Sequence, residues 1–265
     1  RQRYGDERVP VLALQAGADI LADPPHLPSA FRAVIAAVEE GTLSEARIER
    51  SVGRVLRLKE RLGLLDDPYV DASAAAVALG PPAHGAVAEA AGDASVTVLR
   101  LRPEQRLPVP RRWSILVTGW HDESVEALPQ ALKAAGRTVE VVWTGERPGA
   151  RQIGRARKAQ REHDITVVVT AYHGAFPEQR RLVKQLYRNG RTIIVSARSP
   201  YDLAWFPSAT VLVATYGSTP ASMRALARMM QGQSGAAGTS PVRIPYPGRN
   251  QTLFPFGTGV TWSAP

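Results

Sequence analysis

Four side chains that could bind a ligand each follow an apolar run of the sequence: His121, His173, Arg198 and Tyr216. If those runs are parallel strands, the four side chains lie at one edge of a sheet, because ligands on such sheets bind beyond the carboxyl ends of the strands. Aromatic rings there could stack on a carbohydrate, and Arg or His could hydrogen-bond its hydroxyl groups. The favoured alternative is that these loops form an inter-domain surface. A metal site on the two histidines is not supported, since no third ligand with suitable spacing is evident.

The sequence lacks the residues and motifs of several other kinds of site. It contains no cysteine, so it offers no disulfide, thiolate nucleophile or thiolate metal ligand. Neither G-x-G-x-x-G nor G-x-x-x-x-G-K-[ST] occurs, which leaves nucleotide binding without support. G-x-S-x-G is also missing, which argues against a serine hydrolase. We therefore expect neither a cofactor nor a bound metal.

The charge of the chain is strongly basic, with 33 Lys and Arg residues against 24 Asp and Glu residues and a formal net charge of +9. Most of these cations are arginines opposite the apolar positions of predicted helices, so solvated helix faces explain them and no nucleic-acid partner is expected. The densest stretch runs from Arg147 to Arg161, where a surface helix is the default and binding of an anionic polymer, such as a cell-wall polysaccharide, is the alternative. No apolar run approaches the roughly 18 residues of a membrane-spanning helix, so no span is expected.

Residues 102–265 alternate short apolar runs with amphipathic segments. Continuous Val and Ile, as in ITVVVT at 165–170, indicate parallel strands that are buried on both faces of a sheet. The sequence therefore predicts an αβα sandwich with a mainly parallel sheet. Its strands are predicted at 114–118, 138–143, 165–170, 192–197 and 210–214, and its helices at 124–135, 149–162, 178–189, 203–206 and 220–231.

Two further regions precede this sandwich. Residues 66–101 are predicted to be a linker with a connecting helix at 84–94 and a strand at 95–101, because Pro and Gly are frequent near 66–82 and large apolar residues are few. Residues 1–65 predict a helix over 9–15, a buried strand at 18–22 and two helices at 28–40 and 44–63. Since a single strand cannot bury itself, we expect residues 1–65 to dock on structure outside this region.

Several segments resemble family 3 glycoside hydrolases. LALQAGADILADPP at 12–25 and GTLSEARIERSVGRVLRLKERLGL at 41–64 resemble the closing strand and helix of the family's catalytic barrel. RSPYDLAWFP at 198–207 and ATYGSTPASMRALARMMQG at 214–232 resemble the second domain of its β-N-acetylglucosaminidase branch. The resemblance implies that residues 1–65 are the last strand and helices of a (β/α)8, TIM-like barrel, followed by the αβα sandwich.

The resemblance also implies an activity. It points to a retaining exo-glycosidase that hydrolyses terminal β-linked N-acetylglucosamine from peptidoglycan or chitin oligosaccharides, with β-glucosidase or β-xylosidase as the near rival. The nucleophile and the acid/base group of such enzymes belong to earlier barrel segments, whose motifs do not occur in this sequence. We therefore expect no catalytic residue in this chain and a companion N-terminal barrel segment as partner.

Two further expectations depend on that activity. The suspected substrate class favours a secreted or cell-envelope location. The alternative function is a non-catalytic module that binds carbohydrate or stabilises a partner.

Substrate-binding candidates follow from the same resemblance. Asp23 and Pro24, at the end of the last barrel strand, are expected at the carboxyl face of the barrel, where the active sites of such barrels lie. Asp23 departs from the family's usual Leu-Met-Pro pattern, and it is expected either to hydrogen-bond a sugar hydroxyl or to cap the following turn. Tyr4 is expected at the rim. Asp19 is interpreted as structural, fixing the loop before the strand.

Overall fold

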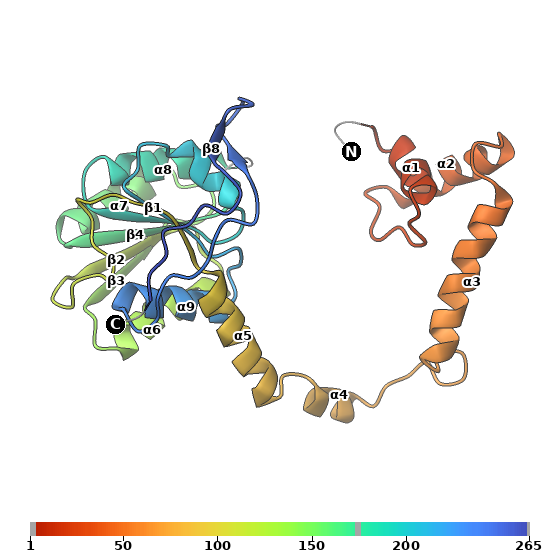
Figure 1. Ribbon diagram of the computed structural model, residues 1–265, viewed down its shortest axis with the longest axis horizontal. Helices are drawn as coiled ribbons and strands as arrows, with labels where there is room; N and C mark the ends of the chain where they lie inside the picture. The colour runs from red at the N-terminus through yellow and green to blue at the C-terminus, as the bar shows by residue number, and fades with distance from the viewer. Residues whose placement is uncertain (1–3, 173–175, 264–265) are drawn as a thin grey trace. The chain divides into compact units, whose positions relative to one another are not determined.

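The computed structural model describes residues 4–172 and 176–263, which form two compact units, Arg1–Leu79 and Gly80–Pro265. Figure 1 labels their helices and strands. None of the helices in the described residues combines the length and the apolar character that a membrane span requires. Each unit is described by itself below.

The first unit is built from helices around a small core. Its helices are α1 (Arg8–Gln15), α2 (Leu27–Glu39), α3 (Glu45–Arg61) and α4 (Ala72–Ala78). The first three match the predicted helices, whereas α4 lies in the predicted linker. The buried core consists of Leu14, Ala37 and Leu43, with partly buried apolar side chains from α1, α2 and α3 around them.

The predicted strand at 18–22 is wrong for this structure. These residues form an irregular loop between α1 and α2, and Ile20 is 64% exposed. The physical reason is the lack of a neighbour, because no strand lies in the described part of the first unit and an isolated strand leaves its backbone donors and acceptors unpaired.

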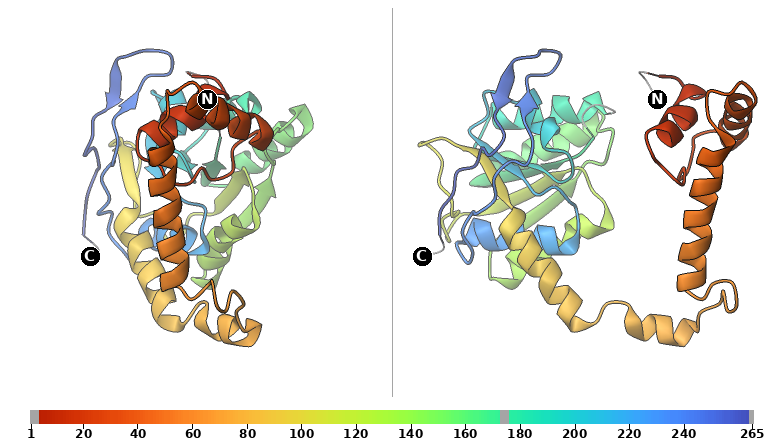
Figure 2. Two further views of the ribbon diagram at one scale, coloured as in Figure 1. Left: turned by 90° about the vertical axis from the view of Figure 1, so that its right-hand side faces the viewer. Right: turned by 45° about the vertical axis from the view of Figure 1, so that its right-hand side comes forward.

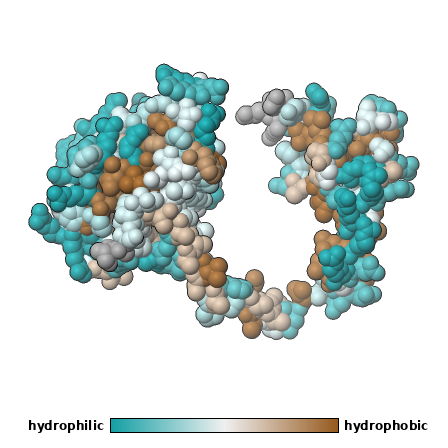
Figure 3. Space-filling view, viewed as in Figure 1, coloured by the Kyte–Doolittle hydropathy of each residue, from teal (hydrophilic) through white to brown (hydrophobic). Residues whose placement is uncertain are grey.

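Much of the apolar surface of the first unit is not covered by the unit itself. Val52 and Leu56 of α3 and Leu62, which follows it, are 49%, 48% and 60% exposed. Phe31 on α2 is 66% exposed. Figure 3 shows these apolar regions as brown patches along the helices of Arg1–Leu79.

The second unit is the αβα sandwich that the sequence predicts. Its six-stranded sheet has the order β1-β6-β5-β4-β2-β3, in which every pair is parallel except β1 with β6. The strands are β1 (Thr97–Leu101), β2 (Ile115–Gly119), β3 (Val139–Trp143), β4 (Ile165–Thr170), β5 (Thr192–Ser196) and β6 (Val211–Ala214).

Helices cover both faces of this sheet, as Figures 1 and 2 show. One face packs on α6 (Ala127–Ala134) and α9 (Pro220–Gln231), and the 3-10 helix η1 (Glu123–Glu126) precedes α6. The other face packs on α7 (Ala150–Arg161), α8 (Pro177–Tyr187) and the 3-10 helix η2 (Pro200–Trp205). Successive strand residues alternate between the two faces, so that Val167 and Val169 lie on the first and Val168 on the second. Burial on both faces of the sheet explains why these strands contain consecutive Val and Ile residues.

The connecting helix and strand predicted before residue 102 belong structurally to the second unit. Helix α5 (Pro82–Ser95) packs on α9, where Glu89 forms ion pairs with Arg224 and Arg228, the latter at 2.8 Å. Strand β1 closes one end of the sheet, and the amide of Val260 donates to Val98 on its outer edge at 2.8 Å. A small hairpin, β7 (Ile244–Pro245) and β8 (Thr252–Phe254), was not predicted.

Candidate functional site

The first candidate site is a pocket of about 320 Å³ in the first unit. Val9, Pro10 and Ala13 of α1 form one side, and the loop at 20–26 forms the other. Most of its lining is apolar, with Asp6, Asp23 and His26 as the polar side chains. A mainly apolar hollow with a few polar groups is the usual composition of a small-ligand site.

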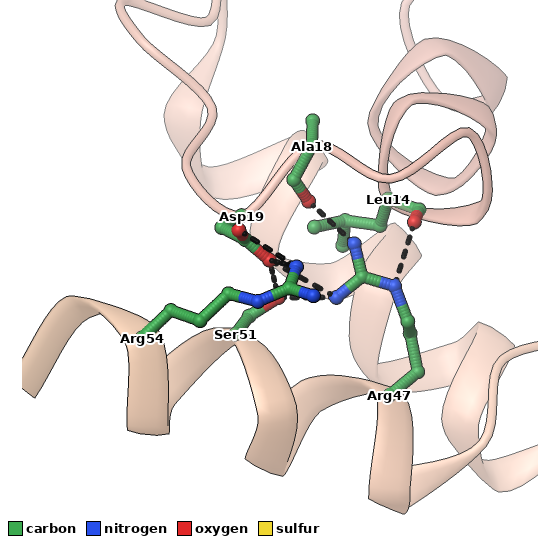
Figure 4. A network of polar contacts seen from close by, with 6 residues as sticks. All are labelled: Leu14, Ala18, Asp19, Arg47, Ser51 and Arg54. Atoms are coloured by element: carbon green, nitrogen blue, oxygen red, sulfur yellow. Dashed lines mark hydrogen bonds and ion pairs between the residues drawn. The ribbon is translucent and has the colours of Figure 1, made fainter.

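The loop that carries Asp23 is fixed by a network around Asp19, which Figure 4 shows. The Ser51 hydroxyl donates to the Asp19 carboxylate at 2.8 Å, and Arg54 donates to both carboxylate oxygens at 3.1 Å. Arg47 donates to the backbone carbonyls of Leu14 at 3.0 Å and Ala18 at 2.9 Å. Asp19 therefore has the structural role predicted from the sequence: it ties the loop to α3, and Arg47 joins both to α1.

The electrostatics of this network favour the ionised carboxylate. The hydrogen bond from Ser51 and then that from Arg54 lower the pKa of Asp19 below its ordinary value. Both oxygens of the Asp19 carboxylate therefore accept hydrogen bonds from side chains of α3.

Asp23 and Pro24, which the family resemblance predicts as substrate-binding residues, both lie in the lining of the pocket. Asp23 has a backbone φ of 45°, in the left-handed region that Asp tolerates better than most residues. His26 caps α2, since its Nδ1 accepts from the amide of Ser29 at 3.2 Å and lies 2.6 Å from the Ser29 hydroxyl. Tyr4 is 45% exposed and is not part of the pocket lining.

The second candidate site lies at the carboxyl edge of the parallel strands in the second unit. Trp120 follows β2, Tyr172 follows β4 and Arg198 follows β5. The Arg198 guanidinium carbon lies 5.6 Å from the ring centroid of Trp120 and 5.0 Å from that of Tyr172. The two rings meet edge to face at 6.1 Å. This arrangement holds one cation between two aromatic rings, with its side chain still 45% exposed.

Asp122 lies beside Arg198 at this edge, and it was not predicted from the sequence. Its Oδ2 accepts from the Ser218 hydroxyl at 3.0 Å and lies 3.7 Å from Arg198, while its Oδ1 accepts from the Val125 amide at 3.1 Å. The signal in the sequence was its place before the helical segment at 124–135, where an Asp is a preferred N-cap. We call Trp120, Asp122, Tyr172 and Arg198 the rim cluster.

The other described residues that were predicted at the rim, His121 and Tyr216, have different partners. His121 points to a different partner, because its Nε2 lies 3.0 Å from Glu126 and its ring stacks near Trp143 at a centroid distance of 5.0 Å. Tyr216 packs against the core on the opposite face of the sheet from α9. His173 lies outside the described residues. Among the residues that the structure describes, no three side chains of the His, Cys, Asp and Glu types gather where they could hold a metal ion.

Known proteins share this architecture. No protein-family profile matches the chain. A β-N-acetylglucosaminidase/β-glucosidase of Cellulomonas fimi is 27% identical over 256 residues, which cover 86% of this chain and 44% of that protein. A solved family 3 β-N-acetylglucosaminidase from Paenibacillus superposes with a TM-score of 0.68 at 28% identity, covering 90% of this chain and 48% of that one. The relatives of this chain are family 3 glycoside hydrolases.

The fold is also shared with more distant structures. The β-glucosidase of Listeria innocua superposes with a TM-score of 0.62 at 19% identity, which shows a shared fold. The mostly parallel α/β sheet of the second unit corresponds to the α/β sandwich of the family 3 C-terminal domain. The chain spans less than half the length of these relatives, 44% of the Cellulomonas protein and 48% of the Paenibacillus one.

Proposed function

We propose that this chain is part of a retaining exo-glycosidase of family 3 that removes terminal β-linked N-acetylglucosamine from peptidoglycan or chitin oligosaccharides. In this proposal the nucleophile and the acid/base group come from a companion barrel segment, and the chain supplies the last barrel elements and the sandwich. The observation that carries the proposal is the 27% identity over 86% of the chain to a relative named for N-acetylglucosaminidase and glucosidase activity.

The surface of the first unit supports a companion segment. Its buried core is small, while large apolar side chains of α2 and α3, such as Phe31 and Leu62, are 66% and 60% exposed. Burying such side chains stabilises a protein by roughly 1.5–3 kcal/mol each, so further barrel structure packed on these helices would gain several of these contributions. Further barrel strands would also give residues 18–22 the neighbours that they need to form a strand.

The pocket supports a role in binding sugar. In the proposal, the Asp23 carboxylate accepts a hydrogen bond from a sugar hydroxyl, and Pro24 and the apolar lining contact the faces of the ring. The Asp19 network holds the loop in place before the ligand arrives, which lowers the entropic cost of binding. Tyr4 remains a candidate for the outer rim of the substrate site.

The test compares the chain alone with the longest polypeptide that its native source produces, which intact mass and N-terminal sequencing define. Hydrolysis of 4-nitrophenyl N-acetyl-β-glucosaminide and of 4-nitrophenyl β-glucoside is followed for both samples. We expect the longer polypeptide to hydrolyse the N-acetylglucosaminide faster and the chain alone to hydrolyse neither substrate.

Three outcomes would overturn the proposal. Activity of the chain alone would show that catalytic groups lie within it. Preference for the glucoside would assign the rival β-glucosidase activity. Tight binding of chitin oligosaccharides by the chain alone, with no activity in the longer polypeptide, would assign a non-catalytic carbohydrate-binding module.

A further inference from the structure

The outer surface of α7 and α8 presents two rows of cations. Both helices pack on the same face of the sheet, so the sides opposite their buried residues point away from it together (Figure 1). The cations of α7 are spaced i, i+4 and i+7. Those of the second row are spaced i, i+3 and i+7, with the first two on α8 and the third on the residue that follows it. We call this surface the basic face; its exposed cations are Arg151, Arg155, Lys158, Arg181, Lys184 and Arg188.

The backbone beneath the basic face is firmly held. Ile153 of α7 and Leu182 of α8 are buried in one core cluster. The side-chain amide of Gln160, itself only 6% exposed, donates to the Leu186 carbonyl at 3.1 Å and so joins the two helices directly. The two rows therefore keep their relative position, and the charges are presented on a rigid surface.

The cations of the basic face are not neutralised by the protein. In the part of the chain that the structure describes, no carboxylate forms an ion pair with any of the six. The sequence of α7, ARQIGRARKAQR, contains no acidic residue, and α8 has only Glu178, in its first turn. Exposed Arg224, in contrast, pairs with Glu89. Like charges packed on one surface repel one another, and an anionic ligand relieves that repulsion.

Three aromatic side chains of the second unit are covered by arginines. The Arg180 guanidinium lies 4.1 Å from the ring centroid of Trp205, Arg191 lies 4.9 Å from that of Trp113, and Arg147 lies 5.3 Å from that of Phe176. Proteins that bind single-stranded nucleic acid offer open aromatic rings on which bases stack. The basic face offers charge without such open rings.

We propose that the basic face binds an acidic polysaccharide whose sugar units each carry a carboxylate. Cations three or four residues apart on a helix are separated by about 4.5–6 Å along its axis, which is comparable to the length of one pyranose unit. Arginine pairs with carboxylates through two parallel hydrogen bonds, which suits a chain of uronic acids. This binding goes beyond the proposed hydrolysis and does not depend on it.

The experiment measures binding of the chain to size-fractionated polygalacturonate as a function of salt. The fully methyl-esterified polymer, which has the same backbone without charge, is the matched ligand control. The test variant neutralises Arg155, Lys158 and Lys184 as glutamines. The matched protein control neutralises three exposed arginines of the loop between β1 and β2, Arg102, Arg106 and Arg111, and so has the same net charge. Circular dichroism melting checks that both variants remain folded.

We expect polygalacturonate to bind and its methyl ester not to bind. Up to six counterion-releasing contacts predict a slope no steeper than about −4 for log affinity against log salt concentration, at about −0.7 per contact. The test variant should show about half that slope and a loss of affinity of at least about tenfold at 50 mM salt. The control variant should retain the slope of the unmodified chain.

Three results would overturn this inference. One is an absence of binding at 50 mM salt. Another is an equal loss in the control variant, which would make net charge, and not this face, the cause. The third is tighter binding to duplex DNA than to polygalacturonate at the same salt concentration, which would assign the face to nucleic acid.

Discussion

Replacing Gly119 by alanine is expected to destabilise the second unit severely. Gly119 ends β2 and precedes Trp120 of the rim cluster, with a φ of 111° that L-residues rarely adopt. A Cβ at this position would lie 2.1 Å from the carbonyl oxygen of Val169 in the neighbouring strand. That oxygen accepts a hydrogen bond from the Trp120 amide at 2.8 Å. Displacing the oxygen would break this hydrogen bond, which fixes the backbone at Trp120 of the rim cluster.

The magnitude follows from two contributions. Holding a non-glycine residue in a sparsely populated backbone region costs about 1–3 kcal/mol. Leaving a buried backbone donor and acceptor without partners costs about another 1–3 kcal/mol. We therefore expect a loss of about 4 kcal/mol in the free energy of unfolding. With a urea dependence of about 2–3 kcal/mol per molar, the midpoint should fall by roughly 1.5 M.

The assay is urea unfolding followed by tryptophan fluorescence. Trp113, Trp120, Trp143, Trp205 and Trp262 are all of the tryptophans, and all lie in the second unit, so the signal reports that unit alone. The matched control is Gly154→Ala on α7, where a Cβ would meet open space and should raise stability by about 0.5–1 kcal/mol. A midpoint for Gly119→Ala within about 0.3 M of the unmodified chain would refute the reasoning.

Two further predictions concern the ionic contacts. The hydrogen bond from Ser51, followed by that from Arg54, lowers the pKa of Asp19 in the folded chain. The ionised Asp19 therefore stabilises the fold above the ordinary carboxyl pKa near 4, and this stabilisation is lost as the pH falls through the lowered pKa. The protection factor of the Ala18 amide against hydrogen exchange should therefore fall in acid, and Asp19→Asn should abolish that pH-dependent step; an unchanged profile in the variant would contradict this. Partial burial raises the pKa of Glu89, but its hydrogen bonds with Arg224 and Arg228 outweigh burial and lower the pKa overall. Glu89→Gln should therefore cost about 1 kcal/mol and lower the melting temperature by about 2–4 °C, and an unchanged or higher value would count against the α5–α9 ion pairs.

The sequence was sufficient to predict the sandwich because each of its elements has a local cause. The Val and Ile runs of β4 and β5 are buried on both sheet faces, and the helices between strands carry one apolar side each. The structural role of Asp19 was also predictable from its position in the loop before the predicted strand.

Other features depend on contacts between distant residues, and sequence patterns do not show them. An apolar run such as 18–22 favours a strand only where a neighbouring strand completes its hydrogen bonds. His121 was expected at the rim, but the carboxylate of Glu126, one helical turn onward, holds it instead. The rim position of Asp122 depends on Ser218, which is far away in the sequence. Asp23, Pro24 and Tyr4 remain predictions as substrate-binding residues.

Strand β1 gives the second unit a particular order of assembly. Thr97 pairs with Ala214 on one side of the strand, and Val98 accepts from the amide of Val260 on the other. During synthesis β1 therefore leaves the ribosome long before either of its partners exists, and its backbone remains exposed until both partners have been made. Pairings between such distant residues form slowly. The segment around Val260 thus covers part of the outer edge of β1, and a chain without it would leave that strand edge open and prone to aggregation.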